Sequence, residues 1–163
     1  MRLFIDTNIL IDLLVKRNPS YSSVVRMFDI ALKRKDSIVI SNLSIINAHY
    51  VVKKIAGVEE AALRTALHNI CTTCEIAPLT VGTTVKSLIS EFKDFEDATQ
   101  YFCALENSCH VIITNNVKDF KLSTLPVMNV VEFLIVYQVE YPLSSRTDTS
   151  NPYPYSIYSP DKV

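Results

Sequence analysis

Aspartate and asparagine side chains interrupt or directly follow apolar segments at several separated points of this 163-residue sequence. The set consists of Asp6, Asn47, Asp94, Asp97, Asn116 and Asp119. Carboxylate and amide oxygens suit Mg²⁺ and Mn²⁺, which proteins typically hold through a few carboxylates, water and substrate phosphates. Two such ions can also stabilise the attacking and leaving oxygens of a phosphodiester. These residue types therefore favour metal-dependent chemistry on phosphate esters.

Each of these residues also has a purely structural interpretation. Asp6 is suited to capping a first helix, and Asp94 and Asp97 have the N-cap and N3 spacing of a later one. A solvated helix position and two turn positions are the structural interpretations of Asn47, Asn116 and Asp119. It is less plausible that all of these residues are purely structural than that any one of them is, because one fold can place several of them at the same edge of a sheet.

Other common catalytic arrangements find no support in the sequence. The chain has only two glycines, which excludes glycine-rich phosphate loops, and no serine with a matched His–Asp pair is apparent. Cys71 and Cys74 have redox or half-zinc-site spacing. They follow a predicted helix, however, so no helix N-terminus lowers a thiol pKa there, and no second Cys/His pair has zinc-ligand spacing. We interpret the four cysteines as buried reduced thiols.

The elements that must position the candidate residues alternate between strand and helix. Strands are predicted at 3–5, 37–40, 75–79, 110–114 and 126–128. Helices are predicted at about 9–14, 21–33, 44–57, 58–69, 80–88, 94–105 and 130–139. Such alternation predicts an α/β fold with a single open parallel sheet and helices on both faces. Ligands bind such sheets beyond the strand ends where strand order reverses, which selects Asp6 and Asn115-Asn116.

The chain length fits one domain, which we place at residues 1–140. Residues 141–163 are rich in proline and tyrosine without periodicity, so we expect an extended tail there. The formal net charge is −1, so any affinity for nucleic acid must come from a local basic patch. Lys33-Arg34-Lys35 and Lys53-Lys54 are candidates, although both also fit the solvated last turn of a helix.

Nothing in the sequence predicts attachment to a membrane. Asp6 and Asp12 interrupt the apolar N-terminal segment, and no small-residue cleavage site follows it. The apolar run at 130–139 is too short to span a bilayer and contains Glu132. We therefore expect a cytoplasmic protein.

Three segments of the sequence resemble blocks of the PIN domain family. LFIDTNILIDLL at 3–14 resembles the first strand and helix of that family. SNLSIINAHYVVKK at 41–54 resembles the second block, in which a serine is followed six residues later by an acid. DFEDATQYFCALENSCHVIITNNVKDF at 94–120 resembles the third and fourth blocks. The resemblance spans roughly residues 1–138 in order, and the tail has no counterpart.

This resemblance implies a five-stranded parallel sheet with an acidic pocket for Mg²⁺ or Mn²⁺. It also implies an endoribonuclease that cuts single-stranded RNA, often as the toxin of a toxin–antitoxin pair and often as a homodimer. Asp6 and Asp97 match the metal-binding acids, Asn116 matches the fourth acidic position as a further metal ligand, and Asp119 matches an auxiliary catalytic acid. Thr114 matches a residue that supports the first aspartate by hydrogen bonding, and Asp94 matches an acid behind the metal ligands.

Two positions depart from the family pattern. Asn47 stands where the family typically has glutamate, and Asn116 where aspartate is common. Each amide removes one negative charge, and a charge near a divalent ion can contribute several kcal/mol before desolvation is counted. A second hypothesis is therefore a catalytically impaired PIN-like module that binds RNA or a protein partner without cleaving.

Two other strand–Asp architectures fit less well. A phosphohydrolase of the haloacid dehalogenase type needs an aspartate two residues after the first, where this chain has Asn8. A receiver-like domain needs an aspartate at the end of the third strand, but that strand ends in Pro78-Leu79-Thr80. Neither architecture accounts for the later acids.

Overall fold

The structure is a computed structural model that describes residues 1–137. Five strands alternate with helices along the chain, as the sequence predicted. The elements are β1 (Arg2–Ile5), α1 (Thr7–Leu14), α2 (Ser20–Lys33), β2 (Ser37–Ser41), α3 (Asn42–Ala56), α4 (Glu60–Thr73), β3 (Glu75–Ala77), α5 (Val81–Leu88), α6 (Phe95–Glu106), β4 (Val111–Ile113), the 3₁₀ helix η1 (Val117–Phe120), β5 (Val127–Met128) and α7 (Val130–Tyr137). The predicted tail and the last residues of the predicted helix at 130–139 lie outside the described residues.

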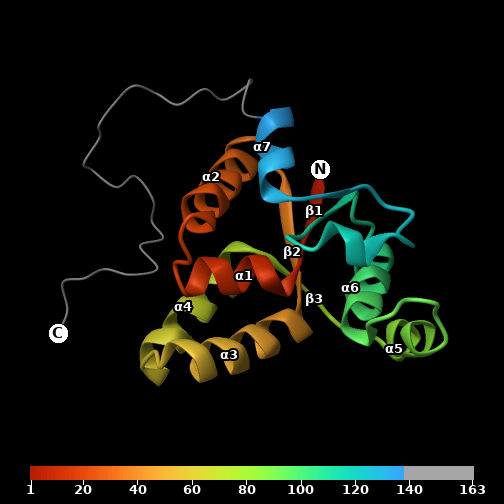
Figure 1. Ribbon diagram of the computed structural model, residues 1–163, viewed down its shortest axis with the longest axis horizontal. Helices are drawn as coiled ribbons and strands as arrows, with labels where there is room; N and C mark the ends of the chain where they lie inside the picture. The colour runs from red at the N-terminus through yellow and green to blue at the C-terminus, as the bar shows by residue number, and fades with distance from the viewer. Residues whose placement is uncertain (138–163) are drawn as a thin grey trace.

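The five strands form one parallel sheet in the order β3-β2-β1-β4-β5. This confirms the predicted α/β fold with a single open parallel sheet. Figure 1 shows α1, α2, α3, α4 and α7 on one side of the strands and α5 and α6 on the other. Within residues 1–137, no helix is both long and apolar enough to cross a membrane.

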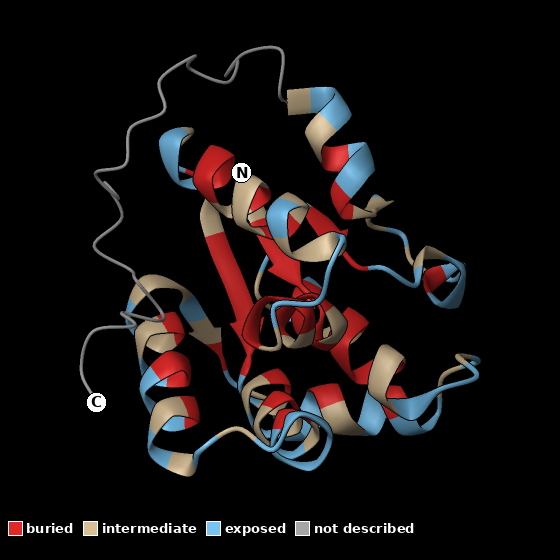
Figure 2. Ribbon diagram, turned by 60° about the vertical axis from the view of Figure 1, so that its left-hand side comes forward, coloured by how far each residue is buried: buried red, intermediate tan, exposed pale blue. Residues whose placement is uncertain are grey.

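The strands alternate their side chains between two separate apolar cores. Leu3 and Ile5 belong to the larger core beneath α1, α2, α3, α4 and α7, whereas Phe4 belongs to the smaller core beneath α6. In β4, Ile112 joins Phe4, and Ile113 joins Leu3 and Ile5. This period of two is what a parallel strand covered on both faces requires. Figure 2 shows the strands as buried through most of their length.

Local signals fixed several of the helix ends. Thr80 caps α5 by accepting a hydrogen bond from the Thr83 backbone N–H, and Asp94 caps α6. Gly57 ends α3 in the left-handed conformation, with φ of 59°. α1 begins directly after Asp6, which is its N-cap residue. The Asp6 side chain makes no capping hydrogen bond, since other side chains occupy its oxygens.

The strand order reverses between β1 and β4, which are neighbours in the sheet. After β1 the chain crosses to β2, whereas after β4 it crosses to β5 on the opposite side. The Asp6 backbone N–H donates to the carbonyl of Ile113 over 3.0 Å, so the ends of β1 and β4 lie side by side. Asp6 and the segment Thr114–Asn116 therefore flank the point at which open α/β sheets bind ligands.

Candidate active site

Asp6 lies at the centre of the candidate site and is only 3% exposed. Its Oδ1 accepts a hydrogen bond from Gln100 Nε2 at 2.6 Å. Its Oδ2 accepts hydrogen bonds from the side chains of Asn8 and Thr114. The bond from Thr114 is the support that the family resemblance implied. Side chains from α1, from α6 and from the residue after β4 thus fix the orientation of one buried carboxylate.

Gln100 is a site residue that the sequence reasoning missed. It is 1% exposed, and its Oε1 accepts from the Ser44 hydroxyl at 3.2 Å, which turns its Nε2 toward Asp6. The same Nε2 also lies 3.2 Å from Thr7 Oγ1. The available signal was a polar residue on the inner face of an amphipathic helix, one turn after Asp97.

Asn8 ties the start of α1 to the segment after β4 and was also missed as a site residue. Its Nδ2 donates to Thr114 Oγ1 at 3.0 Å as well as to Asp6. Its Oδ1 accepts from the Asn115 backbone N–H at 3.1 Å. Asn115 Nδ2 in turn donates to Asp12 Oδ2 at 2.9 Å. These bonds hold the segment that contains Asn116 against the first helix.

Asp97 enters the site from the first turn of α6. Asp94 Oδ1 accepts from the backbone N–H groups of Glu96 and Asp97, at 2.8 and 3.2 Å, and so orients this turn. Burial, together with the negative charges of Asp6, Asp94, Asp119 and Glu96, raises the pKa of Asp97 to about 7. The carboxylates that follow β1, open α6 and lie in η1 are therefore close enough for their charges to act on Asp97.

Burial also raises the pKa of Asp6 above its usual range. Hydrogen bonds from Thr114 and Gln100 oppose this shift, whereas the negative charge of Glu96 adds to it. The same causes act on both carboxylates, because Asp6 is almost fully and Asp97 partly removed from water, and both lie beside other acids.

Asn47 does not occupy a solvated helix position, so that structural interpretation was wrong. It is half-buried on α3, and its Nδ2 donates to Glu96 Oε1 at 2.8 Å. Thr7 Oγ1 donates to the same Glu96 oxygen at 3.1 Å. Glu96 is a third residue that the sequence reasoning missed, although it lies between two acids that were selected.

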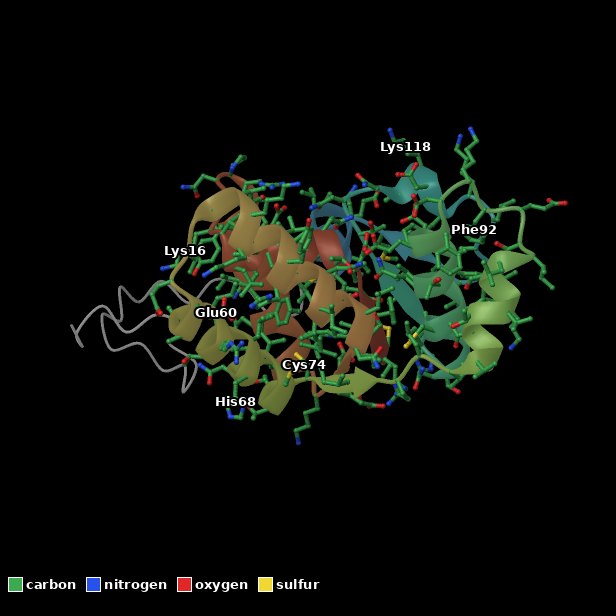
Figure 3. All side chains as sticks on the ribbon, turned by 90° about the horizontal axis from the view of Figure 1, so that it is seen from below. Lys16, Glu60, His68, Cys74, Phe92 and Lys118 are labelled. Carbon is green, nitrogen blue, oxygen red and sulfur yellow. The ribbon has the colours of Figure 1, made fainter. Side chains whose placement is uncertain are left out.

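A pocket of about 750 Å³ opens beside these acids. Asn116 and Asp119 are exposed at its edge. Its lining residues are Glu91, Phe92, Lys93, Asp94, Glu96, Asp97, Asn116, Lys118, Asp119, Lys121 and Leu122. In Figure 3 the labelled Phe92 and Lys118 lie on the side that carries α5 and α6, away from Glu60 and His68. The pocket thus combines a cluster of acids with three lysines.

The basic clusters selected from the sequence are not the ones at this pocket. Lys33 pairs with Asp29 at 3.1 Å, and Lys53 pairs with Glu60 at 3.3 Å. These lysines belong to α2 and α3 and neutralise nearby acids. The lysines at the pocket come instead from the segment before α6 and from η1 and the residue after it.

The cysteines take no part in the candidate site. All four are free thiols; Cys103 and Cys109 are buried, whereas Cys71 and Cys74 are half-buried. Burial raises the pKa of Cys74 and Cys103 to about 12 and that of Cys109 to about 11. These thiols are therefore protonated at neutral pH and poor nucleophiles.

The donor set of the site consists of oxygens, as Mg²⁺ and Mn²⁺ require. Among residues 1–137, no three His, Cys, Asp or Glu side chains are gathered closely enough to form a ready-made ligand set. Asp6 and Asp97, with amide oxygens and water, fit the way Mg²⁺ is usually bound, through one or two carboxylates and several waters.

Comparison with known proteins gives a consistent result. The sequence model of the PIN domain matches residues 2–118. Ribonuclease VapC1 from Aquifex aeolicus (strain VF5) is 26% identical over 137 residues, covering 81% of this chain and 92% of that protein. A toxin–antitoxin complex from Klebsiella pneumoniae contains a chain that is 27% identical, with a TM-score of 0.55, and the match covers 78% of this chain and 97% of that one. VapBC2 from Rickettsia felis, bound to a DNA fragment from its promoter, is 20% identical with a TM-score of 0.58, covering 79% and 98%.

Proposed function

This chain belongs to the PIN domain family, and on that premise we propose that it is a Mg²⁺- or Mn²⁺-dependent endoribonuclease that cuts single-stranded RNA. Ribonuclease VapC1 supports the activity as a relative whose similarity extends over most of both proteins. Asp6 and Asp97 are the proposed cation ligands, with Asn116 as a third. Asp119 is the proposed auxiliary catalytic acid, and Asp94 positions Asp97 by capping α6.

The observation that carries this proposal is the kind of donor around Asp6. The other buried acids of the described chain all have cationic partners: Asp12 pairs with Arg17, Asp29 with Arg26 and Lys33, and Asp36 with Arg34 and the N-terminal amine. The side chains that donate hydrogen bonds to Asp6, those of Asn8, Gln100 and Thr114, are all neutral. Neutral donors orient a carboxylate without cancelling its charge, so this charge stays available to a cation.

The residues of the candidate site and of the adjacent pocket have different proposed roles in phosphodiester cleavage. A bound divalent cation would lower the pKa of the attacking water and stabilise negative charge on the phosphate. Asn8, Thr114 and Gln100 hold Asp6 in one orientation, so little reorganisation is needed when a cation binds. Lys118 and Lys121 line the pocket beside the acids and are suited to the phosphates that flank the cut.

Cleavage of an unstructured RNA during a Mn²⁺ titration tests this proposal. We expect cleavage by the full-length protein at millimolar Mn²⁺, and its loss on adding EDTA. Asp6→Asn and Asp97→Asn should each abolish the activity, because each removes a ligand charge while keeping side-chain shape. Glu106→Gln is the matched control, since Glu106 lies at the other end of α6 and pairs with Lys86. Activity that persists in both aspartate variants would refute the assignment.

A catalytically impaired module that binds RNA without cleaving it is the second candidate function. Asn47 and Asn116 favour it, because each replaces an acid that the family pattern would place in the pocket. The two functions differ in one result. An impaired module should shift RNA in an electrophoretic assay at millimolar Mn²⁺ and leave the strand intact.

A small antitoxin protein is the partner that we propose. The toxin–antitoxin complex from Klebsiella pneumoniae supports this proposal, because the match covers 97% of the similar chain in that complex. Exposed apolar side chains on α5 and just after it offer a surface for association with a partner or a second copy, namely Val81, Val85, Leu88 and Ile89. Co-expression with the product of the adjacent reading frame, followed by size-exclusion chromatography with light scattering, would reveal a stable complex or a homodimer.

A further inference from the structure

Glu96 is held in the site by side chains from two other helices. Its Oε1 accepts hydrogen bonds from Asn47 Nδ2 on α3, at 2.8 Å, and from Thr7 Oγ1 on α1, at 3.1 Å. Both donors are neutral. No residue of the described chain donates to its Oε2. One oxygen of this carboxylate therefore fixes its position, and the other keeps its lone pairs for a ligand.

The start of α6 does not explain why this glutamate is held inward. Asp94 already accepts hydrogen bonds from the backbone N–H groups of Glu96 and Asp97, so the helix needs no further cap. A glutamate that served only the helix dipole could extend into water. Glu96 is instead half-buried beside Asp6 and Asp97, and its charge raises the pKa of both.

We propose that Glu96 supplies the cation-binding carboxylate that this chain lacks at position 47, and that Asn47 is the residue that positions it. The hydrogen bond of 2.8 Å joins the two side chains directly, so the chain has placed the amide on α3 and the acid on α6. Glu96 would then be a third carboxylate for the cation beside Asp6 and Asp97, although the three do not form a ready-made ligand set within residues 1–137. This inference rests on the proposed metal-dependent function.

Mn²⁺ affinity of the RNA-free, full-length protein tests the role of Glu96 without depending on cleavage. Isothermal titration calorimetry should show that Glu96→Gln weakens Mn²⁺ binding by about tenfold or more, the scale on which groups around a metal site act. Glu106→Gln makes the same change on the same helix, ten residues further along, roughly 15 Å by helical rise. This control should keep the affinity of the wild type. An unchanged Mn²⁺ affinity in Glu96→Gln would overturn the inference.

An exchange of the two side chains tests the positioning role of Asn47. The double variant Asn47→Glu/Glu96→Gln returns the acid to α3 and puts the amide on α6. We expect it to recover most of the Mn²⁺ affinity that Glu96→Gln loses, because the site regains its carboxylate. Thermal melts in EDTA check that each variant is folded. Failure of the folded double variant to recover affinity would overturn the claim that these residues have exchanged roles.

The outcomes separate this inference from the function on which it rests. If Asp6→Asn and Asp97→Asn lose both Mn²⁺ binding and RNA cleavage while Glu96→Gln keeps both, the proposed function stands and the inference fails. If the wild-type protein binds no Mn²⁺, both fail.

Discussion

Replacing Asp97 by asparagine should stabilise the metal-free protein at alkaline pH. The carboxylate lies beside Asp6, Asp94, Asp119 and Glu96, and burial together with these charges raises its pKa to about 7 from an ordinary value of 3.8. A folded-state pKa above the unfolded one means that the charged form destabilises the fold. Asparagine has the same shape and carries no charge, so it removes this cost.

The magnitude follows from the difference between the two pKa values. A difference of about 3 pH units at 1.36 kcal/mol each gives an upper limit of about 4 kcal/mol. The side chain is only half-buried, so screening by solvent reduces the expected gain to about 1–2 kcal/mol. The full gain should appear above pH 7. It should shrink as the pH falls from 7 toward 4, because the wild-type carboxyl then takes up its proton in the folded state.

Urea unfolding in EDTA at pH 8, 7, 6 and 5 would measure the free energy of unfolding of both proteins. Glu75→Gln is a control of opposite sign, since the hydrogen bond from Arg2 lowers the pKa of Glu75 below its ordinary value. That variant should lose a small, constant amount of stability across this pH range. If Asp97→Asn is no more stable than the wild type at pH 8, or if its gain is independent of pH, then the acids do not repel one another as described.

Three further predictions test the support of the site, its lysines and its core. Thr114→Val removes one donor to Asp6 and should lower the free energy of unfolding by about 1–3 kcal/mol in urea, whereas no loss would mean that the hydrogen bond contributes nothing. Lys118→Ala should weaken RNA binding and reduce its dependence on salt concentration, while Lys33→Ala should change neither, as titrations at several salt concentrations would show. Phe4→Ala should lower the free energy of unfolding by about 3–5 kcal/mol, because Phe4 is fully buried in the smaller core, and a loss below about 1 kcal/mol would contradict that packing.

The sequence carried enough information for the fold and for the backbone positions of the acids. Short β-branched runs separated by amphipathic helices define a parallel sheet, and the end of each strand is visible as the first polar residue after it. Asp6 and Asn116 were found in this way. Asp94 was found because a helix start has its own local signal.

Contacts between polar side chains that are far apart in the sequence could not be predicted from local sequence patterns. Gln100 and Asp6 are 94 residues apart, and Asn47 and Glu96 are 49 residues apart. Whether a polar residue near a helix start faces water or a neighbouring helix depends on how the helices pack, which a single sequence does not reveal. The lysines at the pocket were also missed. They are isolated in the sequence and come together only in the fold, whereas Lys33-Arg34-Lys35 is visible as a continuous basic run.

The magnitudes also separate a structural from a functional interpretation of the acids in α6. An acid in the first turn of a helix gains about 0.3–1 kcal/mol from the helix dipole. That gain is smaller than the cost of about 1–2 kcal/mol argued above for ionised Asp97 in its half-buried position. Glu96 adds a second charge beside it, and the donors to Glu96 are neutral, so they leave that charge in place. Stabilising the helix therefore does not account for two adjacent acids whose charges act on Asp6, whereas the proposed divalent cation would offset the repulsion among these acids.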